Sequence, residues 1–284
     1  MFSRVSYLVL SMALTSALYA QGPATAPRDH DIYCAGMVTM EPPPGDTYVI
    51  SGVESATRMV FDHGDLVFIN RGANQGAQVG SEFLVTRPVK DKLRAQWFIW
   101  QDELLNVMGT TYADIGRLRV VHVEADTSTA QVVHSCEPLQ RGDIVLPFVT
   151  RPAPNFKPQA ELDVFAPASG KEQAMIVTTR GFAQLASAGK VVYVNLGSDQ
   201  GVRIGDYYRI FRYQGARHGT VYQVRGQERS IWGFGSAPAP WKWVDLPRDI
   251  LGEGIVLGVS QNASTVLITA SLREIYTGDY VEIE

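Results

Sequence analysis

The chain carries one block of sequence twice. Residues 64–80 (GDLVFINRGANQGAQVG) and residues 189–205 (GKVVYVNLGSDQGVRIG) match at a constant offset of 125. Further matches begin at Gly116 and recur from Gly252 onward at an offset of 136. The loop between the two sets of matches is therefore 11 residues longer in the second copy. A chain of this kind is expected to fold as two related units, each with its own core.

The matches also set the boundaries of the predicted domains. A weaker match at the front of each copy places Asp31 opposite Asp163, so the copies cover residues 31–148 and 163–284. Residues 149–162 lie between them and contain three prolines. This composition predicts a short, semi-stiff linker.

Strand signals dominate each copy. Short runs rich in Val, Ile and Leu are bounded by Gly, Asn, Asp, Ser or Pro, which is the pattern of short strands and turns. Helical spacing of apolar residues is found over residues 92–107, which could form one helix. We predict an all-β protein of two tandem small β-barrels, because closing a sheet removes its exposed edges. The strand-like runs of the first copy are 66–69, 83–86, 118–123, 130–133 and 144–146.

Glycines recur at matching places in the two blocks. They punctuate a tight path between two strands, where a residue with a Cβ would often be forced to a positive φ. We therefore predict that six glycines are structural turn residues. These are Gly72, Gly76, Gly80, Gly197, Gly201 and Gly205.

The second copy resembles a known envelope domain. Residues 191–206 (VVYVNLGSDQGVRIGD), followed by 263–266 (ASTV) and 278–281 (GDYV), are similar to the C-terminal small β-barrel domain of flagellar assembly protein T. Similar modules accompany LysM-bearing envelope proteins. The resemblance covers the core block of each copy. It implies a non-catalytic structural or adaptor module of the cell envelope, although this chain carries two such units.

The first residues indicate the compartment. Arg4 is followed by an uncharged, mostly apolar stretch over residues 5–19, and Ala20 is a small residue at a plausible cleavage point. This pattern predicts a signal peptide over residues 1–20, with a flexible arm over residues 21–30. The apolar stretch is shorter than the roughly 20 residues of a membrane-spanning helix. We expect secretion to the periplasm or cell envelope, with no transmembrane segment after signal cleavage.

The chain has two cysteines, Cys34 and Cys136. In an oxidising compartment, a lone pair of cysteines favours a disulfide. Ala166 and Leu272 stand at the matching positions of the second copy, so both cysteines are absent there together. We predict a Cys34–Cys136 disulfide. Two free buried thiols are the alternative.

The sequence offers few candidates for chemistry. No two of the five histidines have the close spacing of a zinc site, and His30 is interpreted as part of a solvated stretch rather than as a weak metal ligand. The motifs of a nucleophile elbow, a phosphate loop, a zinc protease and a dinucleotide site are absent from the sequence. The tripeptide at residues 141–143 (RGD) is interpreted as a turn. We expect no catalytic residues, no metal and no cofactor, and therefore a protein that is not an enzyme.

All five tryptophans fall in the two loops that separate the matched blocks. Rigid aromatic side chains on loops commonly anchor glycans or protein partners. The alternative is that the indoles pack on a barrel or in the contact between the units. We take all five as candidate binding residues: Trp97, Trp100, Trp232, Trp241 and Trp243.

These observations support one leading hypothesis of function. The chain has 25 Lys and Arg against 29 Asp and Glu, a net charge of −4, which argues against a nucleic-acid partner. We expect a non-enzymatic envelope protein that binds an envelope protein partner through its loops. The first alternative is a module that binds peptidoglycan or another glycan, and the second is an unrecognised hydrolase.

The signal peptide yields the first testable prediction. In protein purified from its native host, the mature N-terminus is expected at or near Gln21, because cleavage follows Ala20. Intact-mass analysis measures this directly. An intact Met1 on the exported protein would contradict the prediction.

Overall fold

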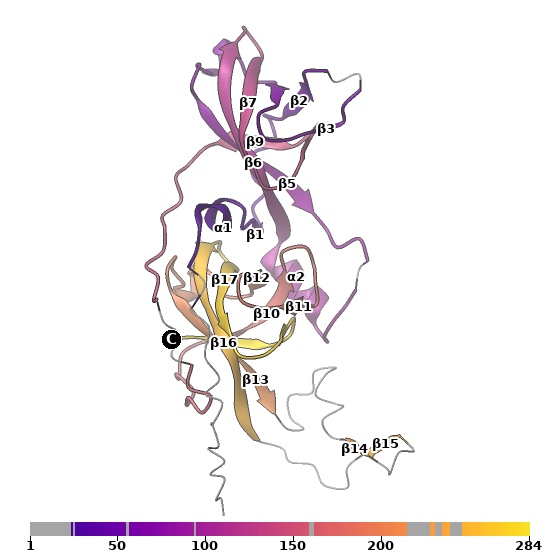
Figure 1. The fold of residues 1–284 in the computed structure, drawn as a ribbon, viewed down its shortest axis with the longest axis vertical. Coiled ribbons are helices and arrows are strands. Elements are labelled where there is room, and N and C mark those ends of the chain that lie inside the picture. The colour runs from indigo at the N-terminus through magenta and orange to yellow at the C-terminus, as the bar shows by residue number, and fades with distance from the viewer. Residues whose placement is uncertain are drawn as a thin grey trace, which may run out of the picture.

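The regular secondary structure of the computed structural model is mostly β-strand, which confirms the all-β fold class. It describes residues 24, 26–54, 57–93, 95–158, 162–214, 228–230, 235–238 and 246–284. Two β units lie one above the other along the long axis of the molecule (Figure 1). The predicted signal peptide lies outside the described residues. Over the described part of the chain, no helix combines the length and the apolar character that crossing a bilayer requires.

The first unit is a strongly curved antiparallel sheet. Its strands follow the order β2-β4-β7-β6-β5-β9, and β1 pairs with β6. The two ends of the sheet meet at a bridge between Tyr48 and Ile144, where Val49 N donates to Asp143 O. The strands are β1 (Met37–Thr39), β2 (Val49–Gly52), β3 (Val60–Phe61), β4 (Leu66–Ile69), β5 (Glu82–Val89), β6 (Thr110–Val123), β7 (Ser128–Ser135), β8 (Leu139–Gln140) and β9 (Ile144–Pro147).

The second unit is a closed barrel. Its strands follow the order β10-β12-β17-β16-β13-β19, and β19 pairs with β10 to close the ring. Residues such as Val192, Ile210 and Val266 fill its interior. The strands are β10 (Gln173–Thr179), β11 (Leu185–Ala186), β12 (Val191–Val194), β13 (Tyr207–Gln214), β14 (Glu228–Ser230), β15 (Ser236–Pro238), β16 (Leu246–Val259), β17 (Ser264–Ser271), β18 (Ile275–Tyr276) and β19 (Tyr280–Ile283).

The strands of the two units correspond by the same two offsets as the sequence blocks. The bounds of β3, β4 and β5 become those of β11, β12 and β13 on adding 125. The bounds of β6, β7, β8 and β9 become those of β16, β17, β18 and β19 on adding 136. The additional residues of the second unit therefore fall between β13 and β16.

The six predicted turn glycines serve two different purposes. Gly76 and Gly201 follow short 3-10 helices, η1 (Ala73–Gln75) and η2 (Ser198–Gln200), at φ values of 79° and 80°. Gly80 and Gly205 likewise have positive φ. Gly72 and Gly197 are extended, so a positive φ does not explain them. A Cβ at either position would overlap backbone atoms of the loop after β6 or β16, so close approach requires glycine there.

Each unit contains a buried pair of arginine and aspartate at matching positions. Arg87 donates two hydrogen bonds to Asp143, at 2.6 and 2.7 Å. Arg212 donates two hydrogen bonds to Asp279, both at 2.6 Å. Burial raises the pKa of Asp279, and the hydrogen bonds from Arg212 oppose that rise. The pairs fix β5 and β13 to the turns before β9 and β19. Residues 141 and 142 form a turn, as the sequence predicted, and Asp143 at its end is buried.

Two short α-helices accompany the sheets in the part of the chain that the structure describes. They are α1 (Asp29–Tyr33) and α2 (Gln101–Met108). The helix considered over residues 92–107 thus forms only in its second half. Asp91 accepts hydrogen bonds from the backbone N–H groups of Leu93 and Ala95, which favours a turn there, and Trp100 lies in the left-handed region at φ 73°.

The buried ion pair generates a stability prediction. Arg87→Met leaves Asp143 as an uncompensated buried charge and should lower the free energy of unfolding by about 3–5 kcal/mol. The matched control is Arg119→Met, because Arg119 pairs with Glu82 at the surface and its side chain is 53% exposed. That change should cost less than about 1 kcal/mol. Denaturant unfolding of both variants checks the difference, and equal costs would contradict it.

Candidate partner-binding surface

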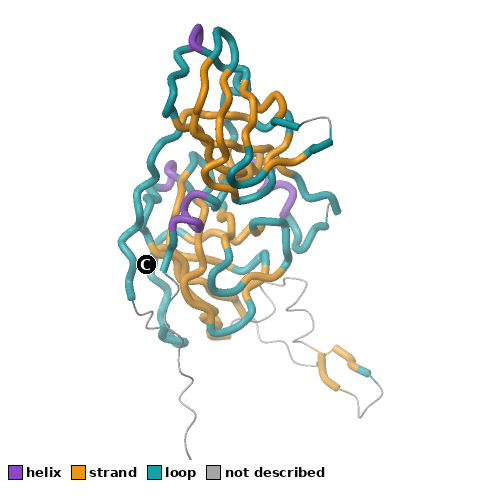
Figure 2. The backbone as a smooth tube through the Cα atoms, turned by 45° about the horizontal axis from the view of Figure 1, so that its top comes forward, coloured by secondary structure: helices purple, strands orange, loops and turns teal. Residues whose placement is uncertain are grey.

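An apolar seam joins the first unit to the outside of the barrel. The first unit contributes Ala35, Val38, Phe98 and Met108 to one buried cluster. Two segments carry these residues: the strap (residues 34–39, including β1) and the Trp loop (residues 90–109, including α2). Strand β1 contacts β17, and α2 contacts β10 (Figure 1). In Figure 2, helices and loops lie between the strands of the two units. The barrel contributes Val177, Val191, Tyr193, Tyr207, Ile255, Leu257, Ala263 and Leu267.

Hydrogen bonds fix the strap on the barrel. The Tyr193 hydroxyl donates to Ala35 O at 2.8 Å, and Thr265 Oγ1 donates to Gly36 O at 3.2 Å. Burial strongly raises the pKa of Tyr193, so its hydroxyl keeps the proton that it donates. Gly36 has a φ of 72°, and a Cβ there would lie 2.6 Å from the Tyr193 hydroxyl oxygen. Close approach and backbone conformation therefore both require glycine at this point.

A buried carboxylate connects the strap to the linker. Asp114 accepts a hydrogen bond from Gly36 N at 2.9 Å. Its two oxygens also accept hydrogen bonds from Arg151, at 2.6 and 2.9 Å, and Arg151 donates to Ile32 O as well. Further along the linker, Lys157 N donates to the Tyr207 hydroxyl at 2.7 Å. The predicted linker is thus held at two points.

The structure places the two tryptophans of the first unit differently. Trp97 is partly buried at the edge of the seam, next to Phe98, which is only 3% exposed and lies over Gly278. Trp100 is 67% exposed, and the neighbouring Ile99 is 65% exposed. The Trp loop therefore packs on the barrel through one end and presents an indole and an aliphatic side chain to solvent. Trp232, Trp241 and Trp243 lie outside the described residues.

The side chain of Gln101 holds the Trp loop in place through one hydrogen bond within the loop and one to the barrel. Gln101 Oε1 accepts from Trp97 N at 2.6 Å, and Gln101 Nε2 donates to Val177 O of the barrel at 2.8 Å. Gln101 is only 3% exposed. The buried side-chain amide of Gln101 fixes the start of α2 directly beside Trp100. The backbone that carries the exposed indole is therefore held in place. Gln101 could not be identified from the sequence, because nothing in its local pattern distinguishes it from a surface glutamine.

A pocket of about 660 Å³ opens along the Trp loop. Both units line it: Trp97 and Leu105 come from the loop, and Thr178 and Phe182 come from the barrel. Asp91, Asp102 and Asn106 add polar residues to its lining. The pocket and the exposed Ile99 and Trp100 together form the candidate partner-binding surface.

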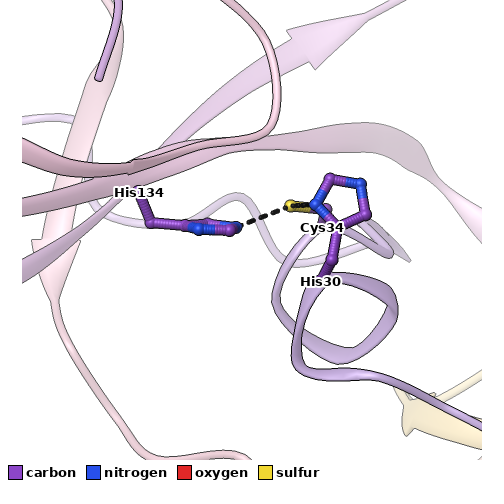
Figure 3. A group of neighbouring side chains, drawn as sticks. All are labelled: His30, Cys34 and His134. Carbon is purple, nitrogen blue, oxygen red and sulfur yellow. Dashed lines mark hydrogen bonds between the residues drawn. The ribbon is translucent and has the colours of Figure 1, made fainter.

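The predicted disulfide is confirmed. Cys34 and Cys136 are bonded, with their Cα atoms 5.5 Å apart, so the strap is tied to the end of β7. His30 and His134 flank this bond (Figure 3). His30 therefore lies on α1 beside the disulfide, and it is exposed together with Arg28 and Asp29, in accord with the solvated stretch that the sequence suggested. Burial, followed by the charges of His30 and Arg117, lowers the pKa of His134.

The seam generates a prediction that uses neighbouring residues. Phe98→Ala removes a ring packed between the Trp loop and the barrel and should lower the free energy of unfolding by about 3–5 kcal/mol. Ile99→Ala removes an exposed side chain and should change it by less than about 0.5 kcal/mol. Denaturant unfolding distinguishes the two variants. A Phe98→Ala variant as stable as Ile99→Ala would show that the ring does not hold the seam.

The chain was compared with family models and with curated proteins. No family model matches the chain, and no curated protein matches it. Its function is therefore argued from the geometry of the candidate surface and from the sequence patterns given above.

Proposed function

We propose that this protein is a non-enzymatic adaptor of the cell envelope, exported to the periplasm, which binds a protein partner through the candidate partner-binding surface. The observation that carries the proposal is the exposed Trp100 beside Ile99 on a base fixed by Gln101. An ordered aromatic side chain binds a partner at small entropic cost, and tryptophan is enriched among the residues that dominate binding energy.

Two further features support an envelope location. A disulfide is typical of proteins outside the reducing cytoplasm, and Cys34 and Cys136 form one. The first 20 residues follow the signal-peptide pattern. The resemblance to flagellar assembly protein T agrees with an adaptor role, because it implies a structural module of the envelope.

The pocket favours glycan binding as a second candidate function. Trp97 supplies an aromatic wall, while Asp91, Asp102 and Asn106 offer carboxylate and amide groups. Aromatic faces with a few polar groups are a common arrangement in ligand pockets, and they suit the apolar faces and hydroxyl groups of a sugar. Peptidoglycan would be the glycan within reach of a periplasmic protein.

One capture experiment separates the two candidates. The mature protein is used as bait in envelope extracts and, in parallel, is sedimented with purified sacculi. Recovery of a protein partner at a fixed stoichiometry, without sedimentation on sacculi, supports the adaptor. Sedimentation on sacculi alone supports the glycan-binding module.

The surface itself is tested by substitution. Replacing Ile99 and Trp100 together by Ala should weaken binding of the captured partner by at least about 2 kcal/mol, because the change removes an exposed aromatic anchor. Phe165→Ala is the matched control, since Phe165 is 85% exposed but lies outside the Trp loop. Titration calorimetry with the identified partner measures both variants. Unchanged affinity in a folded double variant would place the binding surface elsewhere.

A further inference from the structure

The disulfide lies between two imidazoles. His30 Nδ1 is 3.4 Å from Cys34 Sγ, and His134 Nε2 is 3.3 Å from the same sulfur (Figure 3). All three atoms lie within 4.8 Å of one another. Among the residues that the structure describes, no other set of three or more His, Cys, Asp and Glu side chains is gathered this closely.

The chain brings these groups together as two local pairs. His30 and Cys34 are four residues apart across α1 and its C-terminal cap, so they share one face of a helical turn. His134 lies next to the last residue of β7, and Cys136 directly follows the strand. His134 Nε2 contacts Cys34 Sγ, and Cys136 is bonded to that sulfur. Each pair delivers one imidazole and one sulfur to the same point.

This donor set suits a zinc ion. Two imidazole nitrogens and two thiolates are a common tetrahedral set for structural zinc. With bonds of about 2.0 Å to nitrogen and about 2.3 Å to sulfur, such ligands lie about 3.5 Å apart. The nitrogen-to-sulfur separations of 3.3 and 3.4 Å are close to that value before any ion is bound. The two imidazole nitrogens therefore already stand at nearly the required distance from Cys34 Sγ, and reduction would free Cys136 Sγ to complete the set.

We propose that the Cys34–Cys136 disulfide is the oxidised form of a Cys2His2 zinc site. A dithiol reductant breaks the S–S bond by passing two electrons to the two sulfurs, and its two protons pass to the resulting thiols. The reductant itself becomes a disulfide. Zn²⁺ then replaces the two thiol protons, and both thiolates bind the ion together with the neutral imidazoles of His30 and His134.

The surroundings of the bond agree with such an exchange. Cys34 is fully buried, whereas Cys136 is only partly buried, so Cys136 is the more accessible of the two cysteines. His30 is exposed, and a pocket of about 140 Å³ opens beside His134. The two cysteines cannot form a disulfide and bind zinc at the same time. Either state ties α1 and the strap to β7. The inference is independent of the proposed function, because none of these four residues belongs to the Trp loop.

The test compares oxidised and reduced forms of the mature protein. The protein is reduced with a phosphine, which leaves no competing thiol, and is titrated with Co²⁺ as a spectroscopic substitute for Zn²⁺. The reduced protein should bind one equivalent with thiolate-to-cobalt charge-transfer bands, and Zn²⁺ should remove those bands. X-ray absorption of the zinc form should show two sulfur and two nitrogen ligands. The oxidised protein should show no such bands.

Substitutions identify the ligands. His30→Ala and His134→Ala should each weaken zinc binding by the reduced protein by more than the roughly 10- to 100-fold that loss of an outer-shell partner costs. His122→Ala is the control, because His122 is an exposed histidine that contacts Glu124. Its substitution should leave the zinc affinity unchanged.

Folding of the reduced protein is followed by circular dichroism with and without Zn²⁺. Zinc should raise the melting temperature of the reduced protein and leave that of the oxidised protein unchanged. Three results would each overturn the proposal: a folded reduced protein without charge-transfer bands, zinc affinity that survives both histidine substitutions, or a reduced protein that stays unfolded at saturating Zn²⁺.

Discussion

The apolar outer face of the barrel is the constraint on which the rest of the structure depends. Alternate residues of β12 point to opposite sides, yet Val191 and Tyr193 on the outer side are buried, like the residues inside the barrel. Leaving such a face exposed to water would cost roughly 25 cal/mol of free energy for each Å² of apolar surface. The strap and the Trp loop cover it. Because these two segments lie on the barrel, they set the position of the first unit, of the disulfide and of the exposed end of the Trp loop.

Much of the fold could be predicted from the sequence because its signals are local. Strand runs, turn glycines and the repeated offsets depend on neighbouring residues, and the strands occur where these patterns place them. The cysteine pairing could be predicted because the second copy lacks both partners. The seam could not be predicted from either copy alone. A difference between the two copies does indicate the seam. Arg119 and Gln131 of the first copy correspond to Ile255 and Leu267 of the second, and these two apolar side chains are buried in the seam.

Other features were missed because their partners are far apart in the sequence. Arg87 and Asp143 are separated by 56 residues, and neither has a local pattern that indicates burial. Their recurrence as Arg212 and Asp279 was the available signal. The histidines beside the disulfide were missed for a related reason. Each local pair holds one histidine and one cysteine, His30 with Cys34 and His134 with Cys136. The two pairs become neighbours only when α1 packs against β7.

The two attachments of the linker have a consequence for how firmly the units are held. Arg151 is fixed on the first unit through Asp114, and Lys157 is fixed on the barrel through Tyr207. The tether between the units is therefore about six residues rather than the whole of residues 149–162. A short tether gives each unit a high effective concentration at the surface of the other. A seam of modest area then suffices to keep the two units in a single relative orientation.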